Sequence, residues 1–347
     1  MVESELTSIQ EIALHKVGNK LNDENIYLSN SPLKISEVIS GLLIKYFLTP
    51  FKKSEYYNFY HESDLLLNVI YSSVSYIFNN PDEFYKQSVN IAQHLYEQST
   101  HPKIKAGELY VCLLKDCIID GETLDAVGIF KSESKETFLK VYPEGNNYNI
   151  ESEDGININK LDKGCLIFNT EQEKGYLVTV IDNISKSSEA RYWIDDFLHL
   201  RQREDEYFQT QNLMKLCKSF VTEHLPDEFD VDKADQADIL NKSVKFLKEK
   251  EEFTMDDFAN EVMQAPELID NFKDYKQQYE QEFDIVIANE FNISEDAVKK
   301  QARVFKSIIK LDKNFHIYVH GNRQYIQKGY DENTGMHYYQ LFYKDEN

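Results

Sequence analysis

The sequence predicts an α+β protein: a helical N-terminal part packed on an antiparallel sheet, then a helical C-terminal part ending in a three-stranded β meander. Apolar residues at helical spacing dominate residues 1–105, and short runs of β-branched and aromatic residues dominate residues 106–200. Helical spacing then returns. We therefore expect an N-terminal α+β domain at 1–200 and a C-terminal domain at 201–347, with the meander at 315–343.

The N-terminal part is expected to be helical. Pro32, which follows Ser31, opens one run of apolar residues that recur every three or four positions. These residues are Leu33, Val38, Ile39, Leu42, Leu43, Tyr46 and Phe47. Pro81 opens a second helix, with Asp82 and Glu83 in the first turn, where acidic side chains are favoured.

The middle of the chain is expected to form an antiparallel sheet. Five strands are predicted near residues 110–119, 126–131, 137–142, 165–169 and 176–182. The connections between them are too short for the crossover helices that parallel strands require. A doubly wound sheet is therefore not expected.

The composition indicates an ordered core and an acidic surface. Hydrophobic residues make up 41% of the chain, and 60 acidic against 38 basic residues give a net charge of −22. No apolar run approaches the roughly 18 residues that a membrane span needs, and residues 1–10 lack the features of a secretory signal. We expect a cytoplasmic protein with no membrane partner and no cofactor, whose scattered cysteines are reduced, buried thiols rather than metal ligands.

Four stretches together resemble a known family. They are Lys-Gly-Cys-Leu-Ile-Phe-Asn at 163–169, Glu-Ala-Arg-Tyr-Trp-Ile-Asp-Asp-Phe-Leu at 189–198, Gln-Thr-Gln-Asn at 209–212 and the run 297–319. In this order they resemble the 37-kDa nucleoid-associated protein family of bacteria, in the variant typical of Bacteroidetes. The resemblance implies a cytoplasmic, nucleoid-located protein that associates with DNA and has no known enzymatic activity or catalytic residues.

Direct binding to DNA requires a locally basic face, because a chain at −22 is repelled by phosphates as a whole. One helix is predicted to begin after Ser294 and to carry cations on a single stripe, although an ordinary solvated helix face has the same pattern. The residues predicted to contact DNA are Lys299, Lys300, Arg303, Lys306 and Lys310, with Arg323 and Lys328 as outlying contacts.

Two more specific forms of nucleic-acid binding are considered. Residues 287–298 partly match a helix-turn-helix, but Glu295 and Asp296 would then face base edges and phosphates. Residues 315–347 hold eight aromatic residues, which could stack on the bases of a single strand. The alternative for these rings is ordinary packing within the meander, because Tyr and Phe are favoured in strands.

Other function classes remain open. The main alternative is an acidic protein-interaction module whose acid-rich segment 227–238 docks a basic or DNA-bound protein. A homodimer would raise avidity by pairing two weak basic faces. A nuclease can be built from Asp125 with Glu133 and Lys135, where the two carboxylates would hold Mg²⁺. Such a short pattern often arises by chance, so we expect a non-catalytic protein.

Overall fold

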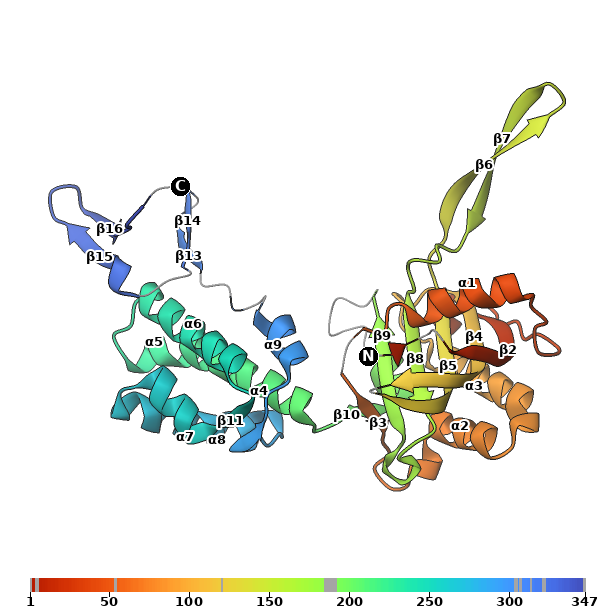
Figure 1. Ribbon diagram of the computed structural model, residues 1–347, viewed down its shortest axis with the longest axis horizontal. Helices are drawn as coiled ribbons and strands as arrows, with labels where there is room; N and C mark the ends of the chain where they lie inside the picture. The colour runs from red at the N-terminus through yellow and green to blue at the C-terminus, as the bar shows by residue number, and fades with distance from the viewer. Residues whose placement is uncertain are drawn as a thin grey trace. The chain divides into compact units, whose positions relative to one another are not determined.

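The chain forms two compact units, Met1–Arg203 (unit 1) and Glu204–Asn347 (unit 2), which are described separately (Figure 1). The computed structural model describes residues 2–3, 6–52, 55–119, 121–183, 192–302, 305, 308–312, 314–319 and 323–345. Helices and antiparallel sheets occur in both units. The α+β class is therefore confirmed.

Unit 1 is built on an antiparallel sheet of eight strands, counted over the described residues, in the order β1-β4-β5-β8-β9-β3-β10, with β2 also paired to β4. The strands are β1 (Val2–Glu3), β2 (Ser8–Val17), β3 (Tyr57–Phe59), β4 (Gly107–Ile119), β5 (Glu122–Ser132), β8 (Lys163–Phe168), β9 (Leu177–Asp182) and β10 (Leu200–Gln202). Strands β4, β5, β8 and β9 follow one another as neighbours. The predicted antiparallel arrangement is confirmed for them.

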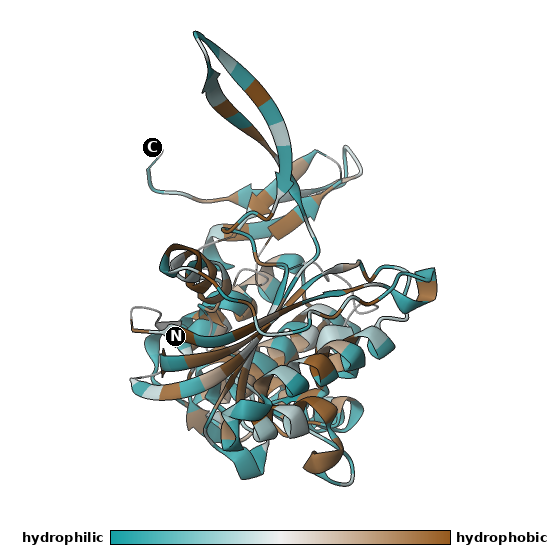
Figure 2. Cartoon of the chain, turned by 90° about the vertical axis from the view of Figure 1, so that its right-hand side faces the viewer, coloured by the Kyte–Doolittle hydropathy of each residue, from teal (hydrophilic) through white to brown (hydrophobic). Residues whose placement is uncertain are grey.

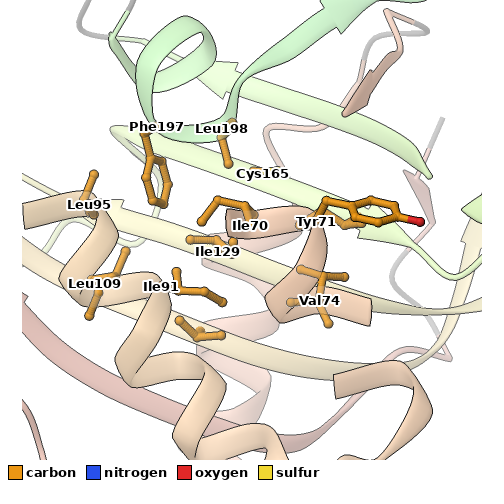
Figure 3. Packing of buried hydrophobic residues seen from close by; sticks show 14 of the residues in the cluster. Ile70, Tyr71, Val74, Ile91, Leu95, Leu109, Ile129, Cys165, Phe197 and Leu198 are labelled. Carbon is orange, nitrogen blue, oxygen red and sulfur yellow. The ribbon is translucent and has the colours of Figure 1, made fainter. Parts of the chain in front are cut away.

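Helices cover both faces of this sheet. The longer ones are α1 (Glu37–Leu48), α2 (Val69–Asn79) and α3 (Phe84–Gln98), and the short ones are η1 (Lys20–Asn22), η2 (Leu65–Leu67), η3 (Pro81–Glu83), η4 (Gln172–Lys174) and the π-helical turn η6 (Ile194–Leu198). Because successive strand residues face opposite sides, Leu113 of β4 packs with α2 and α3 while Leu114 packs with α1. Figure 3 shows the first of these two cores.

The expectation that residues 1–105 are helical is wrong for β2, which pairs along the length of β4. A bulge between Ile9 and Glu11 interrupts the alternation of β2, so its apolar residues imitate helical spacing. Helix α1 also begins later than predicted. Ser36, not Ser31, caps it, because the Ser36 Oγ accepts from the Ile39 N–H at 3.4 Å.

Strands β6 (Glu136–Glu144) and β7 (Asn147–Gly155) form a ribbon of their own. The strand predicted at 137–142 is confirmed, but it pairs only with β7 and lies outside the main sheet. Figures 1 and 2 show this ribbon projecting far from the rest of unit 1. Most of its residues are exposed to solvent and none is buried.

Unit 2 begins as a helical bundle. Its elements are α4 (Glu206–Ser219), the π-helical η7 (Phe220–His224), α5 (Leu225–Glu228), α6 (Lys233–Glu249), β11 (Glu252–Thr254), α7 (Met255–Phe258), the π-helical η8 (Ala259–Met263), α8 (Pro266–Phe283), β12 (Glu290–Asn292) and α9 (Glu295–Ala302). Aromatic rings fill the core, where Phe220 meets Phe272 edge-on with centroids 5.0 Å apart. Asp232 and Asp235 form a capping box that starts α6.

Two hairpins end the described part of unit 2, where the sequence predicts a three-stranded meander. Strand β13 (Ile308–Leu311) pairs with β14 (Phe315–Tyr318), and β15 (Ile326–Asp331), after η9 (Arg323–Tyr325), pairs with β16 (Met336–Leu341). The meander is therefore wrong, since β14 pairs with β13 and not with β15. The β-branched pair Ile308 and Ile309 favours a strand, and its pairing with β14 decides the local structure.

Two further expectations concern membranes and thiols. Over the described ranges, no helix combines the length and apolar character needed to cross a membrane. All four cysteines are buried and unbridged, and burial raises the pKa of the Cys117 thiol to about 11. The prediction that the thiols are buried and not joined in disulfides is confirmed.

Candidate nucleic-acid interface

Helix α9 carries two of the predicted cations. Ser294 starts it, since the Ser294 Oγ accepts from the Ala297 N–H at 3.4 Å, and Val298 is buried on its inner side. Lys299 lies exposed on the outer side, with its Nζ 2.9 Å from a carboxylate oxygen of Glu295. That hydrogen bond raises the pKa of Lys299. Because both partners are solvated, a phosphate can compete with Glu295 for this ammonium.

Lys300 points in another direction. Its Nζ lies 5.4 Å from the centroid of the Tyr207 ring, in a cation–π contact with helix α4. The Tyr207 ring is buried. Lys300 therefore helps to hold α9 on α4 and offers only part of its ammonium to a ligand.

The predicted stripe from residue 299 to 310 is not one helix. Helix α9 ends at Ala302, and Lys310 lies exposed on strand β13, opposite His316 of β14. Arg303 and Lys306 lie outside the described residues. The physical reason for the correction is the strand pairing of Ile308 and Ile309, which overrides the apolar spacing of a helix.

The interpretation of residues 287–298 as a helix-turn-helix is also wrong. Residues 290–292, within the segment 287–298, form strand β12 and pair with β11. A recognition helix would need a helix directly before its turn, whereas α8 has already ended at Phe283.

Arg323 is occupied by structural contacts. Its guanidinium lies 2.7 Å from Asp235 and 3.1 Å from Asp232, and it donates to the Ile326 carbonyl. Although burial opposes it, the hydrogen bonds from the Asp232 N–H and from Arg323 hold the pKa of Asp235 below its ordinary value. Arg323 therefore joins the cap of α6 to the base of β15.

Lys328 and many aromatic rings are exposed on the two C-terminal hairpins. The exposed rings are Phe315, Tyr318, Tyr325, Tyr330, Tyr338, Phe342 and Tyr343. Lys328 faces Tyr339 across the β15–β16 pair. The Tyr338 ring lies over Gly329, where a Cβ atom would come within 2.3 Å of it. The sequence shows the number of rings but not their exposure, which depends on the pairing of the strands.

Unit 1 holds a cation–ring pair that was not predicted from the sequence, in which Arg201 is exposed and Tyr60 is half-buried. The Arg201 guanidinium carbon lies 3.7 Å from the centroid of the Tyr60 ring, and the His199 ring stacks 6.0 Å from the same centroid. The pair depends on the pairing of β10 with β3, two strands far apart in the sequence.

The residues of the nuclease pattern do not meet. Asp125 pairs with Lys115 at 2.5 Å and Lys135 pairs with Glu108 at 2.8 Å. Glu133 forms a buried ion pair with Lys131 at 2.9 Å. Eight residues of extended strand place Asp125 and Glu133 roughly 26 Å apart. Among the described residues, no group of three His, Cys, Asp or Glu side chains could hold a metal ion.

Acidic side chains gather elsewhere in unit 2. A groove of about 590 Å³ beside the β11–β12 pair is lined by five acids, namely Glu204, Asp205, Glu206, Glu252 and Glu290. Phosphates would be repelled there. In the acid-rich segment 227–238, Asp232 and Asp235 are held by the cap and by Arg323, while Asp227, Glu228 and Asp230 are exposed.

Comparisons with known proteins agree with the resemblance in the sequence. A search of curated proteins found no match. The family model described as nucleoid-associated protein YejK matches residues 13–336, which span both units. The chain therefore belongs to this family of nucleoid-associated proteins.

Proposed function

We propose that this protein is a non-catalytic component of the bacterial nucleoid that binds DNA directly through the C-terminal hairpins of unit 2, with a preference for single strands. The observation that carries the proposal is the exposure of aromatic rings beside cations on β13–β16. Tyr318 and Tyr330 each expose more than half of their surface, and Lys310 and Lys328 are exposed on the same hairpins.

Rings and cations on these hairpins suit a single strand. A base can stack on an exposed ring, which is worth about 1–3 kcal/mol per base, while neighbouring ammonium groups pair with phosphates. The contacts would come from Lys310, Lys328 and Lys344, with Lys299 on α9 as a fourth. Arg303 and Lys306 add to this set by their sequence positions.

Broad coating of duplex DNA is not favoured. The net charge of −22 and the acidic groove of unit 2 repel a polyanion beyond the local contacts. Four phosphate contacts would give a salt slope of about −3 on a single strand, which is a modest value. Binding is therefore expected to be local and moderately weakened by salt.

Equilibrium binding of the purified full chain tests the proposal. Fluorescence anisotropy with labelled single-stranded and duplex DNA, from about 25 to about 200 mM salt, should show tighter binding to the single strand and loss of affinity with salt. Lys310→Glu combined with Lys328→Glu should weaken binding at least about tenfold. The absence of binding at the lowest salt would exclude direct contact.

Matched variants separate stacking from general damage. Tyr318 and Tyr76 are both 59% exposed, but Tyr76 lies on α2 of unit 1. Tyr318→Ala should weaken single-strand binding about tenfold, while Tyr76→Ala should leave it unchanged. Equal effects of the two substitutions would count against the hairpins as the binding surface.

A protein-mediated association is the second candidate. The exposed acids Asp227, Glu228 and Asp230 favour it, because they attract basic or DNA-bound proteins. It predicts no binding to purified DNA and capture of a basic protein that is lost when these three acids are changed to Asn or Gln. The anisotropy experiment distinguishes the two candidates.

A further inference from the structure

The β6–β7 ribbon has two chemically different faces. Its strands pair in regular register from Glu136 with Gly155 to Glu144 with Asn147, so directly opposed residues share a face. One face carries only uncharged side chains from the middle of the ribbon to its tip. They are Leu139, Val141, Pro143, Tyr148, Ile150 and Ser152.

The opposite face carries charged and polar groups that pair with one another, together with the ring of Phe138, which is 44% exposed. Lys140 lies 3.3 Å from Glu153, and Asn149 donates to the Tyr142 hydroxyl at 3.2 Å. The same hydroxyl donates to Glu151. The ribbon as a whole holds five acids and one lysine, so this face and the ribbon ends are negative.

The uncharged face is left in water by the rest of unit 1. Leu139 is 74% exposed, Tyr148 78% and Ile150 63%. With Val141 and Pro143, these side chains expose on the order of 500 Å² of apolar surface, as large as the largest patch on a typical monomer. Figure 2 shows apolar segments along the projecting ribbon. A two-stranded ribbon is only marginally stable alone, so covering this face would also stabilise it.

We propose that the uncharged face of the β6–β7 ribbon packs against the same face of a second copy of this chain. The face is self-complementary because it carries no charge at its centre, where Val141 opposes Ile150. Two copies would bury about 1,000 Å² in total, at the lower limit of specific interfaces. Pairing these faces also leaves Lys140, Glu151 and Glu153 in water.

Other occupants fit this face less well. DNA would meet five acids against one lysine on the ribbon. A basic protein would be attracted to the face that holds Glu151 and Glu153, and not to the uncharged one. The charges also give self-association a characteristic salt response. Because two acidic ribbons repel each other, salt should strengthen the dimer, whereas salt weakens binding to DNA or to a basic protein.

Sedimentation velocity of the full chain tests the proposal. The wild type should dimerise at micromolar concentration, more tightly at about 500 mM than at about 50 mM salt. Ile150→Lys should raise the dissociation constant at least about tenfold, because the ammonium would be buried without a partner. Asn147→Lys is the matched control: it adds the same charge on the same strand but on the opposite face.

A second measurement keeps the test independent of folding defects. The four native cysteines are buried, so Ile150→Cys introduces an accessible thiol at the centre of the face. Mild oxidation should join two copies through it far faster than through Asn147→Cys. A monomeric wild type at about 100 µM, or a dimer that survives Ile150→Lys, would refute the proposal. Ile150-dependent binding of polylysine by a monomeric chain would refute it in favour of a basic partner.

Discussion

The two exposed ribbons, β6–β7 in unit 1 and β15–β16 in unit 2, are both two-stranded and antiparallel but carry different side chains. The first presents branched aliphatic residues such as Val141 and Ile150 on one face, and the second presents tyrosines beside Lys328. Aliphatic side chains cannot stack on bases and gain most from contact with another apolar surface. Tyrosine rings can stack on bases and can also pack against an apolar surface. The two proposals therefore rest on a difference in side-chain chemistry between two ribbons of the same type.

The ribbons also differ in how they are anchored. At the base of the first ribbon, the buried carboxylate of Asp162, which follows β7, accepts hydrogen bonds from two N–H groups that precede β6. The donors are Glu133 and Ser134, at 2.7 Å each. Before β15, the Arg323 guanidinium joins Asp232 and Asp235. The first anchor is a buried anion on backbone donors, and the second is a half-exposed ion-pair network. The first should therefore be the stronger.

Removing the anchor of the first ribbon should have the largest effect. Asp162→Ala leaves two backbone donors without a partner in a buried site, and we expect it to lower the free energy of unfolding of unit 1 by about 3 kcal/mol. Urea denaturation measures the change. Asp154→Ala, which removes an exposed carboxylate on the ribbon itself, is the control and should change stability by less than about 0.5 kcal/mol.

Removing the anchor of the second ribbon should have a smaller effect on stability. Arg323→Ala leaves Asp232 and Asp235 close together without their counter-ion, which should cost about 2 kcal/mol in unit 2. Affinity for single-stranded DNA should fall as well, because the rings of β15–β16 lose their fixed position. Arg323→Lys should restore only part of both, since an ammonium cannot reproduce the two-sided contact. Unchanged DNA affinity in Arg323→Ala would indicate that β15–β16 is not part of the binding surface.

One alanine substitution on each ribbon tests whether the two ribbons have separate functions. Tyr330→Ala should weaken single-strand binding about tenfold and leave the dimer unchanged. Leu139→Ala should weaken the dimer about threefold and leave DNA binding unchanged. Anisotropy and sedimentation on the same preparations measure both. If either substitution affects both activities equally, the two ribbons do not have separate functions.

The sequence predicts the centre of unit 1 best. Strands β4, β5 and β8 are buried on both faces along much of their length, so each holds a continuous apolar run, at 110–114, 126–130 and 165–168. It fails where pairing between distant segments decides the structure. Strand β2 imitates a helix through its bulge, and β13 does so because Ile309 continues the apolar spacing of α9. The exposure of Tyr318 and Leu139 could not be predicted, because spacing alone does not show which strands lack a covering layer.

The same distinction between local and distant determinants applies to the predicted site residues. Lys299 was identifiable because its exposure follows from the apolar row that packs inward on α9. The contacts of Arg323 were not, because Asp235 lies 88 positions earlier in the sequence. An exposed helix stripe is encoded locally, whereas an ion pair between distant segments is created only by the fold.

Charge reversal on α9 should give a smaller effect than loss of a ring. Lys299→Glu should weaken single-strand binding by about threefold and reduce the salt slope by about 0.7. Lys86 of α3 is the matched control: it is 71% exposed and pairs with Glu83, as Lys299 is 67% exposed and pairs with Glu295. Lys86→Glu should leave DNA binding unchanged. Equal weakening by both variants would show that only the net charge of the chain matters.

The smallest expected effect is that of pH, which should lower the stability of the two units in different pH ranges. His15 of β2 is buried; its Nε2 lies 3.1 Å from the Ser88 Oγ, and its Nδ1 accepts from the Ser29 N–H. Burial lowers the pKa of His15 from its ordinary value of 6.5. The neutral ring is therefore favoured in the folded state, and its contribution to stability is present above pH 6.5 and lost as the pH falls below that value.

Unit 2 responds in a lower range. The pKa of Asp235 is held below its ordinary 3.8, so the stability from its contacts is present above that pH and is lost as the pH falls further. Lowering the pH from 7 to 5 should therefore destabilise unit 1 while the Arg323 anchor of unit 2 stays intact. Thermal unfolding at the two pH values measures the change. His15→Gln should flatten the dependence of unit 1 on pH in this range. The same slope in the variant would mean that another group, such as the half-buried His94, whose pKa burial also lowers, controls it.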